Sequence, residues 1–228
     1  MPRPNTRERI ALSSLELFNA LGERSVSTNH IAASMEISPG NLYYHFANKQ
    51  EIVALLFGQY ESRVDECLRL PQARAATVED MEGALTGLIE AIWSYRFFYR
   101  DLEHLLDSDP QLASRYQRFS QRCLARAQAI HEGLVQAGIL TMRPHEVEAV
   151  TLNAWIVLTS WVRYRGVSHQ TGVSHETTAA LDEEMLKRGV YQVLTLLLGF
   201  VSPAWRDAVD ALCERFYVPL DQVPVAAD

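Results

Sequence analysis

Hydrophobic residues recur at three- and four-residue intervals along almost the whole chain, and no strand-like alternation extends beyond a few residues. This is the period of amphipathic helices, so the sequence predicts an all-α protein. Beyond the first 48 residues, helices are expected at about 49–70, 78–99, 102–108, 109–136, 144–165, 178–201 and 203–216. A Gly/Ser/His/Thr-rich loop is expected between residues 166 and 178, and a loose tail after Pro219.

Two very short helices are predicted before residue 48, joined by a tight turn at residues 36–37. The first, at about 28–35, can be capped by the hydroxyl of Ser27 or Thr28. The second opens with Ser38 as N-cap and Pro39 at its first position, where no N–H is needed. Two short helices joined in this way are typical of a helix-turn-helix that reads the DNA major groove.

The second short helix has few side chains to divide between a core-facing side and an exposed side. These are Asn41, Tyr43, Tyr44 and His45, and the exposed side that they form suits a major groove. For the aromatic residues, packing inside a small helical bundle is the alternative interpretation. Directly downstream, Asn48 and Glu51 are spaced as in a capping box, so Lys49 lies at the start of a long helix. The helix dipole and the free amides there favour a phosphate group.

From about residue 7 to residue 53, the chain resembles the DNA-binding domain of the TetR family of bacterial transcriptional regulators. The resemblance rests on Ser-Pro-Gly-Asn-Leu-Tyr-Tyr-His-Phe at 38–46 and Asn-Lys-Gln-Glu-Ile at 48–52, which are similar to the family's recognition helix and the start of its fourth helix. It implies a three-helix, helix-turn-helix DNA-binding domain at residues 1–53. It also implies a helical effector-binding and dimerisation domain at 54–218, followed by a loose tail at 219–228.

The resemblance also implies which residues lie at a double-stranded DNA operator. They are Thr28, Ser38, Pro39, Gly40, Asn41, Tyr43, Tyr44, His45 and Lys49. Relatives place the positions of Tyr44, His45 and Lys49 mostly on phosphates and use the front of the helix for base edges.

The chain departs from the family pattern at two positions of the helix-turn-helix. Glu36 stands where most members have a glycine in the turn. If its backbone φ is positive, we expect a strain of roughly 1 kcal/mol. Pro39 stands where some relatives carry a basic or polar residue that reads bases, so the operator sequence does not follow from the family pattern.

Charge is distributed unevenly along the chain. The whole chain carries 21 Lys and Arg against 28 Asp and Glu, a formal charge of −7, so it is not a general binder of polyanions. Residues 1–50 carry +1 and the remainder −8. An acidic body would steer DNA to one end. Because few phosphates would be neutralised per subunit, we expect a modest salt dependence and an affinity that requires two subunits.

The helices at about 144–165 and 178–201 are the candidates for a homodimer interface. Their apolar stripes would be interpreted as internal core from periodicity alone. The resemblance implies instead that they form a four-helix bundle between two subunits, which would present two reading helices to a palindromic operator. The expected interface residues are Val157, Leu158, Trp161, Val162, Val193 and Leu197.

The segment 93–106 holds five aromatic residues and two arginines, more than a simple amphipathic helix needs. With neighbouring helices it could line an apolar pocket for a small hydrophobic effector. The expected pocket residues are Trp93, Arg96, Phe97, His104, Tyr116 and Trp155. A filled aromatic core with the arginines paired outside is the alternative. The Tyr-Arg-Phe-x-x-x-Asp-Leu sequence also resembles the TetR subgroup that includes PhaD, which implies an acyl-thioester or fatty-acid-like effector.

Other function classes find little support. The chain has no Gly-rich phosphate loop, no Gly-x-Ser-x-Gly and no paired Glu-x-x-His, so an enzyme is not expected. No cofactor is predicted, and no metal site, because His145 with Glu148 and the loop residues His169 and His175 are isolated. Cys67, Cys123 and Cys213 are expected to be buried thiols.

The longest apolar run, 193–201, is too short to span a membrane, and the polar start predicts no signal peptide, so a cytoplasmic location is expected. The sequence therefore predicts a cytoplasmic, homodimeric, DNA-binding transcriptional regulator, with repression as the default. Two alternatives stay open: an activator, or a DNA-binding protein whose body docks a protein partner.

Overall fold

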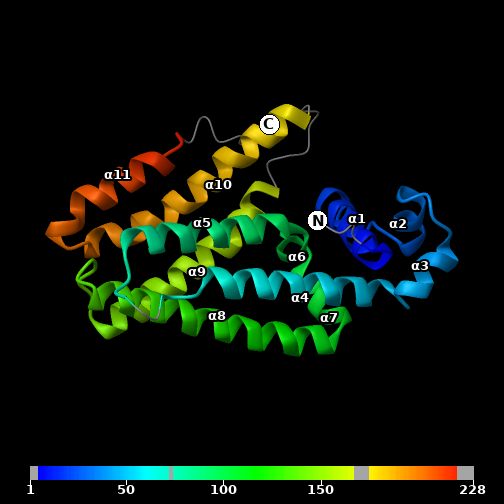
Figure 1. Cartoon of the computed structure of the whole chain (residues 1–228), viewed down its shortest axis with the longest axis horizontal. Coiled ribbons are helices and arrows are strands. Elements are labelled where there is room, and N and C mark those ends of the chain that lie inside the picture. Colours follow the sequence, from blue (N-terminus) through cyan, green and yellow to red (C-terminus); the bar gives the residue numbers. More distant parts are fainter. Residues whose placement is uncertain (1–4, 72–73, 167–174, 220–228) are drawn as a thin grey trace. The chain divides into compact units, whose positions relative to one another are not determined.

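The computed structural model describes residues 5–71, 74–166 and 175–219 of the chain. The described part is helical, as predicted, and its extended pairing amounts to an isolated antiparallel bridge between Leu140 and Val201 (Figure 1). None of the described helices is both long and apolar enough to cross a membrane. The bounds are α1 Thr6–Leu21, α2 Thr28–Ser34, α3 Pro39–His45, α4 Lys49–Cys67, α5 Val78–Ser94, α6 Arg96–Arg100, α7 Leu102–Ser108, α8 Pro110–Gln136, α9 Pro144–Gly166, α10 His175–Leu197 and α11 Arg206–Phe216, with 3-10 turns at Leu198–Phe200 and Pro203–Trp205.

Most predicted helices are confirmed within a few residues, but the one expected at 78–99 is two helices, α5 and α6. The break falls at Tyr95, whose φ of −115° and ψ of 33° leave the helical region. The side chain of Asn19 in α1 supports the break. Its Nδ2 donates to the carbonyl of Ser94 at 2.8 Å, and its Oδ1 accepts from the amide of Phe97 at 3.0 Å. Because α1 satisfies these backbone groups, the helix can end without a glycine or proline.

The chain forms two compact units that do not follow chain order. Unit 1 comprises residues 1–63 and 94–118, and unit 2 comprises residues 64–93 and 119–228, so α4 and α8 contribute to both. In unit 1, α1 packs against α2, α3 and α6, and α2 packs against α3. The segment that carries the predicted helix-turn-helix therefore shares its unit with α6 and α7.

The core of unit 1 is aromatic. Phe57 stacks on Phe98 with ring centroids 4.8 Å apart, and Phe18 lies 5.2 Å from Phe97. The hydroxyl groups of Tyr60 and Tyr99 are hydrogen-bonded at 2.7 Å, which satisfies both groups inside the core. The aromatic run at 95–99 thus helps to fill a core within unit 1, the arrangement that the sequence left open as the alternative to a pocket.

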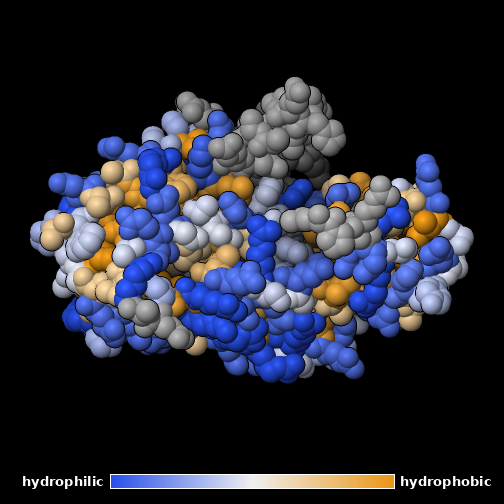
Figure 2. Space-filling view, viewed as in Figure 1, coloured by the Kyte–Doolittle hydropathy of each residue, from blue (hydrophilic) through white to orange (hydrophobic). Residues whose placement is uncertain are grey.

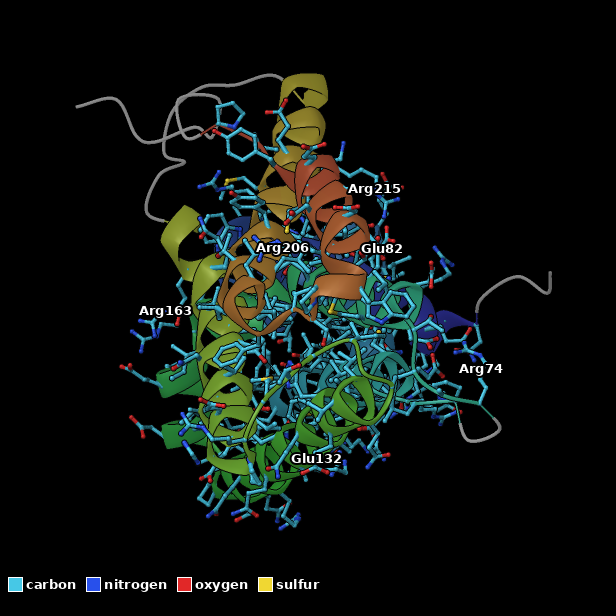
Figure 3. The ribbon with its side chains drawn as sticks, turned by 90° about the vertical axis from the view of Figure 1, so that its left-hand side faces the viewer. Arg74, Glu82, Glu132, Arg163, Arg206 and Arg215 are labelled. Carbon is cyan, nitrogen blue, oxygen red and sulfur yellow. The ribbon has the colours of Figure 1, made fainter. Side chains whose placement is uncertain are left out.

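In unit 2, α10 packs against α9 and α11. Trp161 of α9 donates from Nε1 to the carbonyl of Met185 at 2.9 Å. Its ring lies against Gly189 of α10, where an added Cβ would approach Cδ1 to 2.8 Å. Figure 3 shows Arg215 of α11 beside Glu82 of α5, and their side chains pair with 2.5 Å between Nη2 and Oε2. These contacts fasten α9, α10, α11 and α5 together.

The three cysteines are free thiols, as expected. Cys123 and Cys213 are buried, and burial raises the pKa of the Cys213 thiol. Cys67 is only half-buried, which differs from the expected burial, and its sulfur lies against Gly87, where an added Cβ would come within 2.7 Å.

Candidate nucleic-acid interface and body cavity

The two short helices begin as their sequences predict. Ser27 Oγ accepts from the amide of His30 at 3.1 Å at the start of α2. Ser38 Oγ accepts from the amide of Asn41 at 3.1 Å at the start of α3, and Pro39 occupies its first position. The caps satisfy amides that would otherwise stay unpaired, so both helices can form although neither exceeds 7 residues.

The turn between α2 and α3 has the left-handed backbone that the family's glycine would allow. Glu36 has a φ of 57°, and its amide donates to the carbonyl of Ala33 at 3.2 Å. The amide of Ile37 donates to the carbonyl of Ala32 at 3.0 Å. A residue with a Cβ is strained by about 1 kcal/mol in this conformation. The positive φ on which the expected strain at Glu36 depends is therefore present, and the strain itself stays a prediction.

The helix α3 buries one face and presents the other. Leu42 has no exposed surface, whereas Tyr44 is 85% exposed and Tyr43 is 49% exposed. The hydroxyl of Tyr43 lies 3.0 Å from Oγ1 of Thr28, so α2 orients this ring. His45 is half-buried and meets the ring of Tyr44 edge-on at 5.1 Å. The remaining predicted residues at this surface are exposed: Ser38, Pro39, Gly40 and Asn41.

Lys49 differs from the other predicted DNA-contacting residues, because its ammonium group is bound inside the protein. Nζ donates to the carbonyls of Glu23 and Val26 at 2.8 and 2.9 Å and pairs with Oε1 of Glu23 at 2.8 Å. Its side chain is 22% exposed and that of Glu23 is 7% exposed. At the same helix start, Asn48 Oδ1 accepts from the amide of Glu51 at 2.9 Å, as the capping box predicts.

Glu23 also links α1 to the corner between α6 and α7. Its amide donates to Oδ2 of Asp101 at 2.9 Å, and Arg100 donates from Nη2 to the carbonyl of Phe18 at 2.5 Å. Among the residues that the structure describes, Oε2 of Glu23 finds no hydrogen-bond partner, and it lies 3.9 Å from Nε2 of His104. His104, expected in an effector pocket, therefore lies beside this carboxylate. Within unit 1, the connection after α1 holds both the first residue of α4 and the α6–α7 corner.

Unit 2 contains a small apolar cavity of about 40 Å³. Its lining comes from the residue after α4 and from α5, α8, α9 and α10. The polar side chains in this lining are those of His131 and Thr151. His131 Nδ1 lies 2.8 Å from Thr151 Oγ1, and burial lowers the pKa of this histidine to about 4.

The residues predicted for an effector pocket do not converge. Trp155 lines the cavity and packs against Phe119 with ring centroids 6.4 Å apart. Phe97 and Tyr116 belong to the unit 1 core, where Tyr116 lies 5.9 Å from Phe98. The other three, Trp93 in α5, Arg96 in α6 and His104 in α7, are half-buried and do not line the cavity. The six residues fall in two units, because the chain divides between Trp93 and Ser94 and again within α8, so they do not line one cavity.

The predicted interface residues also need correction. Leu158, Val193 and Leu197 are at most 3% exposed within a single chain, and Leu158 and Leu197 line the cavity. Val157 and Trp161 are half-buried, and the side chain of Val162 lies outside the described part. The exposed apolar residues of α9 are instead Leu152 at 47% and Ile156 at 50%. Periodicity identified the helix but selected its inward face.

Comparison with known proteins decides the family. Residues 12–56 match the profile described as bacterial regulatory proteins, tetR family, and residues 59–209 match the TetR profile described as bacterial transcriptional repressor. The chain belongs to the TetR family. The TetR-family regulators matched include a solved structure from Marinobacter aquaeolei VT8, with 45% identity and a TM-score of 0.85, covering 94% of this chain and 100% of that one.

More distant similarities extend over most of the chain. The HTH-type transcriptional regulator UidR of Escherichia coli strain K12 is 27% identical over 191 residues, which are 83% of this chain and 80% of UidR. The structure of Salmonella enterica GusR, at 16% identity and a TM-score of 0.58, covers 86% of this chain and 97% of its own and shares the fold. The two TetR profiles and UidR show that the chain is a transcriptional regulator of the DNA-binding, helix-turn-helix type and that its relatives are not enzymes. Helices α2 and α3 lie within the first of these profiles. The resemblance to the PhaD subgroup stays a prediction.

Some residues of these sites carried no signal in the sequence of this TetR protein. Glu23 is an isolated acidic residue after Gly22, and Asp101 lies 78 positions further along the chain. His131 and Thr151 lie on different helices and meet only in the fold. Sequence periodicity relates residues within one helix, so it does not reveal pairs that form only when different helices pack together.

Proposed function

We propose that the protein is a homodimeric repressor that binds a palindromic operator through two copies of α3 and is released by a small hydrophobic effector. The observation that carries the DNA-reading part is the uncommitted outer face of α3, above all the 85% exposed ring of Tyr44. An aromatic ring exposed to water adds no stability to the free protein, whereas on a DNA duplex it can contact sugar, phosphate or base.

The charge of unit 1 argues for two subunits acting together. Arg7, Arg9 and Arg24 are exposed, but Lys49 uses its ammonium group internally. One subunit therefore neutralises few phosphates and binds DNA weakly. Two subunits related by a twofold axis double these contacts and require a palindromic site.

The exposed stripe of α9 is the surface we propose for dimerisation. Leu152 and Ile156 are separated by one helical turn and are each about half exposed. Two such side chains on one face of a long helix favour burial against a second copy. The buried residues Leu158, Val193 and Leu197 then form the layer beneath this interface.

The matched family profile supports repression, and the cavity in unit 2 supports release by an effector. The profile matched over residues 59–209 is that of a bacterial transcriptional repressor. A ligand in unit 2 would shift the equilibrium between two dimer arrangements, by no more than the difference between its affinities for them. Because bacterial DNA lies in the cytoplasm, we propose that the protein binds its operator there.

The proposal is tested with an operator selected from random duplex DNA by the purified protein. Tyr44→Ala should weaken operator binding more than about tenfold, as expected for loss of one good contact of about 1.4 kcal/mol or more. Glu132→Ala, at the exposed surface of α8 (Figure 3), is the control and should bind like the wild type. Fluorescence anisotropy measures both. Failure to select any sequence would contradict the proposed function.

The interface is tested separately by light scattering. Ile156→Asp places a charge in the proposed dimer contact and should yield monomers that lose operator affinity. Gln111→Asp adds the same charge at an exposed position in the first turn of α8, so it should stay dimeric. If Ile156→Asp remains a dimer, the subunits associate through another surface.

A further inference from the structure

The polar pair in the unit 2 cavity has a defined hydrogen-bond direction. Thr151 Oγ1 lies 2.7 Å from the carbonyl of Val147 and 2.8 Å from His131 Nδ1. The carbonyl can only accept, so the single hydroxyl proton of Thr151 satisfies that contact. The second contact is then a hydrogen bond only if Nδ1 of His131 carries a proton and donates it to Oγ1.

This tautomer leaves Nε2 of His131 as an acceptor. A neutral imidazole has one N–H, and the contact with Thr151 assigns it to Nδ1. The hydrogen bond to the backbone carbonyl of Ala127, which opposes the lowering of the pKa, is then made by the same N–H, so Nε2 keeps its lone pair. The ring is only 8% exposed and lines the cavity. Because burial lowers its pKa to about 4, the imidazole is neutral at neutral pH and offers no positive charge.

The rest of the lining excludes an anionic ligand. No arginine, lysine, aspartate or glutamate is among the described residues that form this cavity. A carboxylate or phosphate group placed there would be desolvated without a counter-charge, which is strongly unfavourable. The exposed surface over α8 is hydrophilic (Figure 2), in contrast to the apolar lining of the cavity. The lining therefore matches an uncharged molecule.

The size of the cavity limits the ligand to a compact one. About 40 Å³ is free, and one water molecule requires roughly 10–15 Å³. A larger group enters if neighbouring side chains move, and Met81 in the lining is a flexible residue that adapts its shape to such changes. Any ligand larger than a few water molecules requires such a movement, which favours a compact molecule over a long chain.

We propose that this cavity binds an uncharged, compact apolar molecule that donates one hydrogen bond to Nε2 of His131, as an alcohol or a phenol does. The identification of this ligand as the effector rests on the proposed function, but the binding itself does not. A free fatty acid, with its carboxylate in this lining, is the less favoured ligand.

Three probes of similar shape test the assignment: phenol, toluene and benzoate, titrated by calorimetry into the full chain. Phenol should bind, and benzoate should bind more than about a hundredfold more weakly because its charge has no partner. The affinity ratio of phenol to toluene should fall about tenfold in His131→Leu, since the acceptor is gone. Thr151→Val removes the oxygen that holds the proton on Nδ1 of His131, so it should also lower the affinity ratio of phenol to toluene.

Two further variants make the outcome unambiguous. Ala154→Leu fills the cavity and should abolish binding of phenol and toluene, whereas Glu132→Ala, exposed beside His131 on α8, should change neither. Thermal unfolding confirms that each variant is folded. Absence of phenol binding, binding of benzoate as tight as that of phenol, or an unchanged ratio in both His131→Leu and Thr151→Val would overturn the assignment.

Failure of this assignment can be distinguished from failure of the proposed function. Operator binding without phenol binding overturns the ligand class and leaves the regulator intact. Phenol binding with the expected selectivity, in a protein that selects no operator, supports the cavity assignment and contradicts the regulator.

Discussion

Replacing Lys49 by methionine separates a structural role from a DNA-contacting role. The change removes the ammonium group and keeps an unbranched side chain of similar length. Two carbonyls and the Glu23 carboxylate lose a donor that now lies 2.8 to 2.9 Å away. The Glu23 side chain is 7% exposed, so water replaces little of what is lost.

The magnitude follows from this burial. Breaking a fully buried ion pair costs about 3–5 kcal/mol. Since Lys49 is 22% exposed, part of the interaction is already screened, and we expect a loss of about 2–3 kcal/mol in the free energy of unfolding. Glu23→Gln in the Lys49→Met background removes the unpaired charge, so the double variant should recover at least about 1 kcal/mol of that loss.

Urea unfolding followed by far-ultraviolet circular dichroism measures these differences, and the two single and one double variants complete a double-mutant cycle. Operator binding at several salt concentrations measures the other role, because loss of a phosphate contact lowers the salt slope by about one per subunit. We expect an unchanged slope. Wild-type stability together with a reduced slope would show that Lys49 contacts DNA and would refute the reasoning.

Three other perturbations test single features of the structure. Glu36→Gly should raise the free energy of unfolding by about 1 kcal/mol by relieving the left-handed turn, and urea unfolding that shows no gain would contradict the strain. Burial lowers the pKa of His131 from its ordinary 6.5 to about 4, so the unfolded chain binds more protons between these values. Stability should therefore fall by up to about 3 kcal/mol from pH 6.5 to pH 4, and in urea unfolding at several pH values His131→Leu should lose less. Gly189→Ala should destabilise by about 1–3 kcal/mol by thermal unfolding because its Cβ meets Trp161, whereas Gly199→Ala, in open space, should not; equal effects would contradict the close packing.

The helix-turn-helix could be predicted because its signals are local. Ser27, Ser38 and Pro39 act within one turn of their own position, so their effect on the backbone is readable from the sequence alone. The backbone at Glu36 could also be predicted, because the glycine of the family pattern indicates a positive φ at this position. A residue with a Cβ is expected to be strained in that conformation.

The rest required tertiary information. The break after α5 depends on Asn19, which is 75 positions away from Ser94 in the chain. In α9, apolar residues occur on both sides of the helix, and a period cannot tell the buried Leu158 from the exposed Ile156. The aromatic run at 95–99 was rich enough for either a pocket or a core, and only the packing of unit 1 decides in favour of a core.

The division of the chain into two units has a spectroscopic consequence. All four tryptophans, Trp93, Trp155, Trp161 and Trp205, lie in unit 2, whereas six of the nine tyrosines lie in unit 1. Tryptophan emission excited at the red edge of the absorption band therefore reports unit 2 alone and does not detect unit 1, which carries the helix-turn-helix. Comparing that emission with tyrosine absorbance during a single denaturation would show directly whether the two units melt as one cooperative body or in succession.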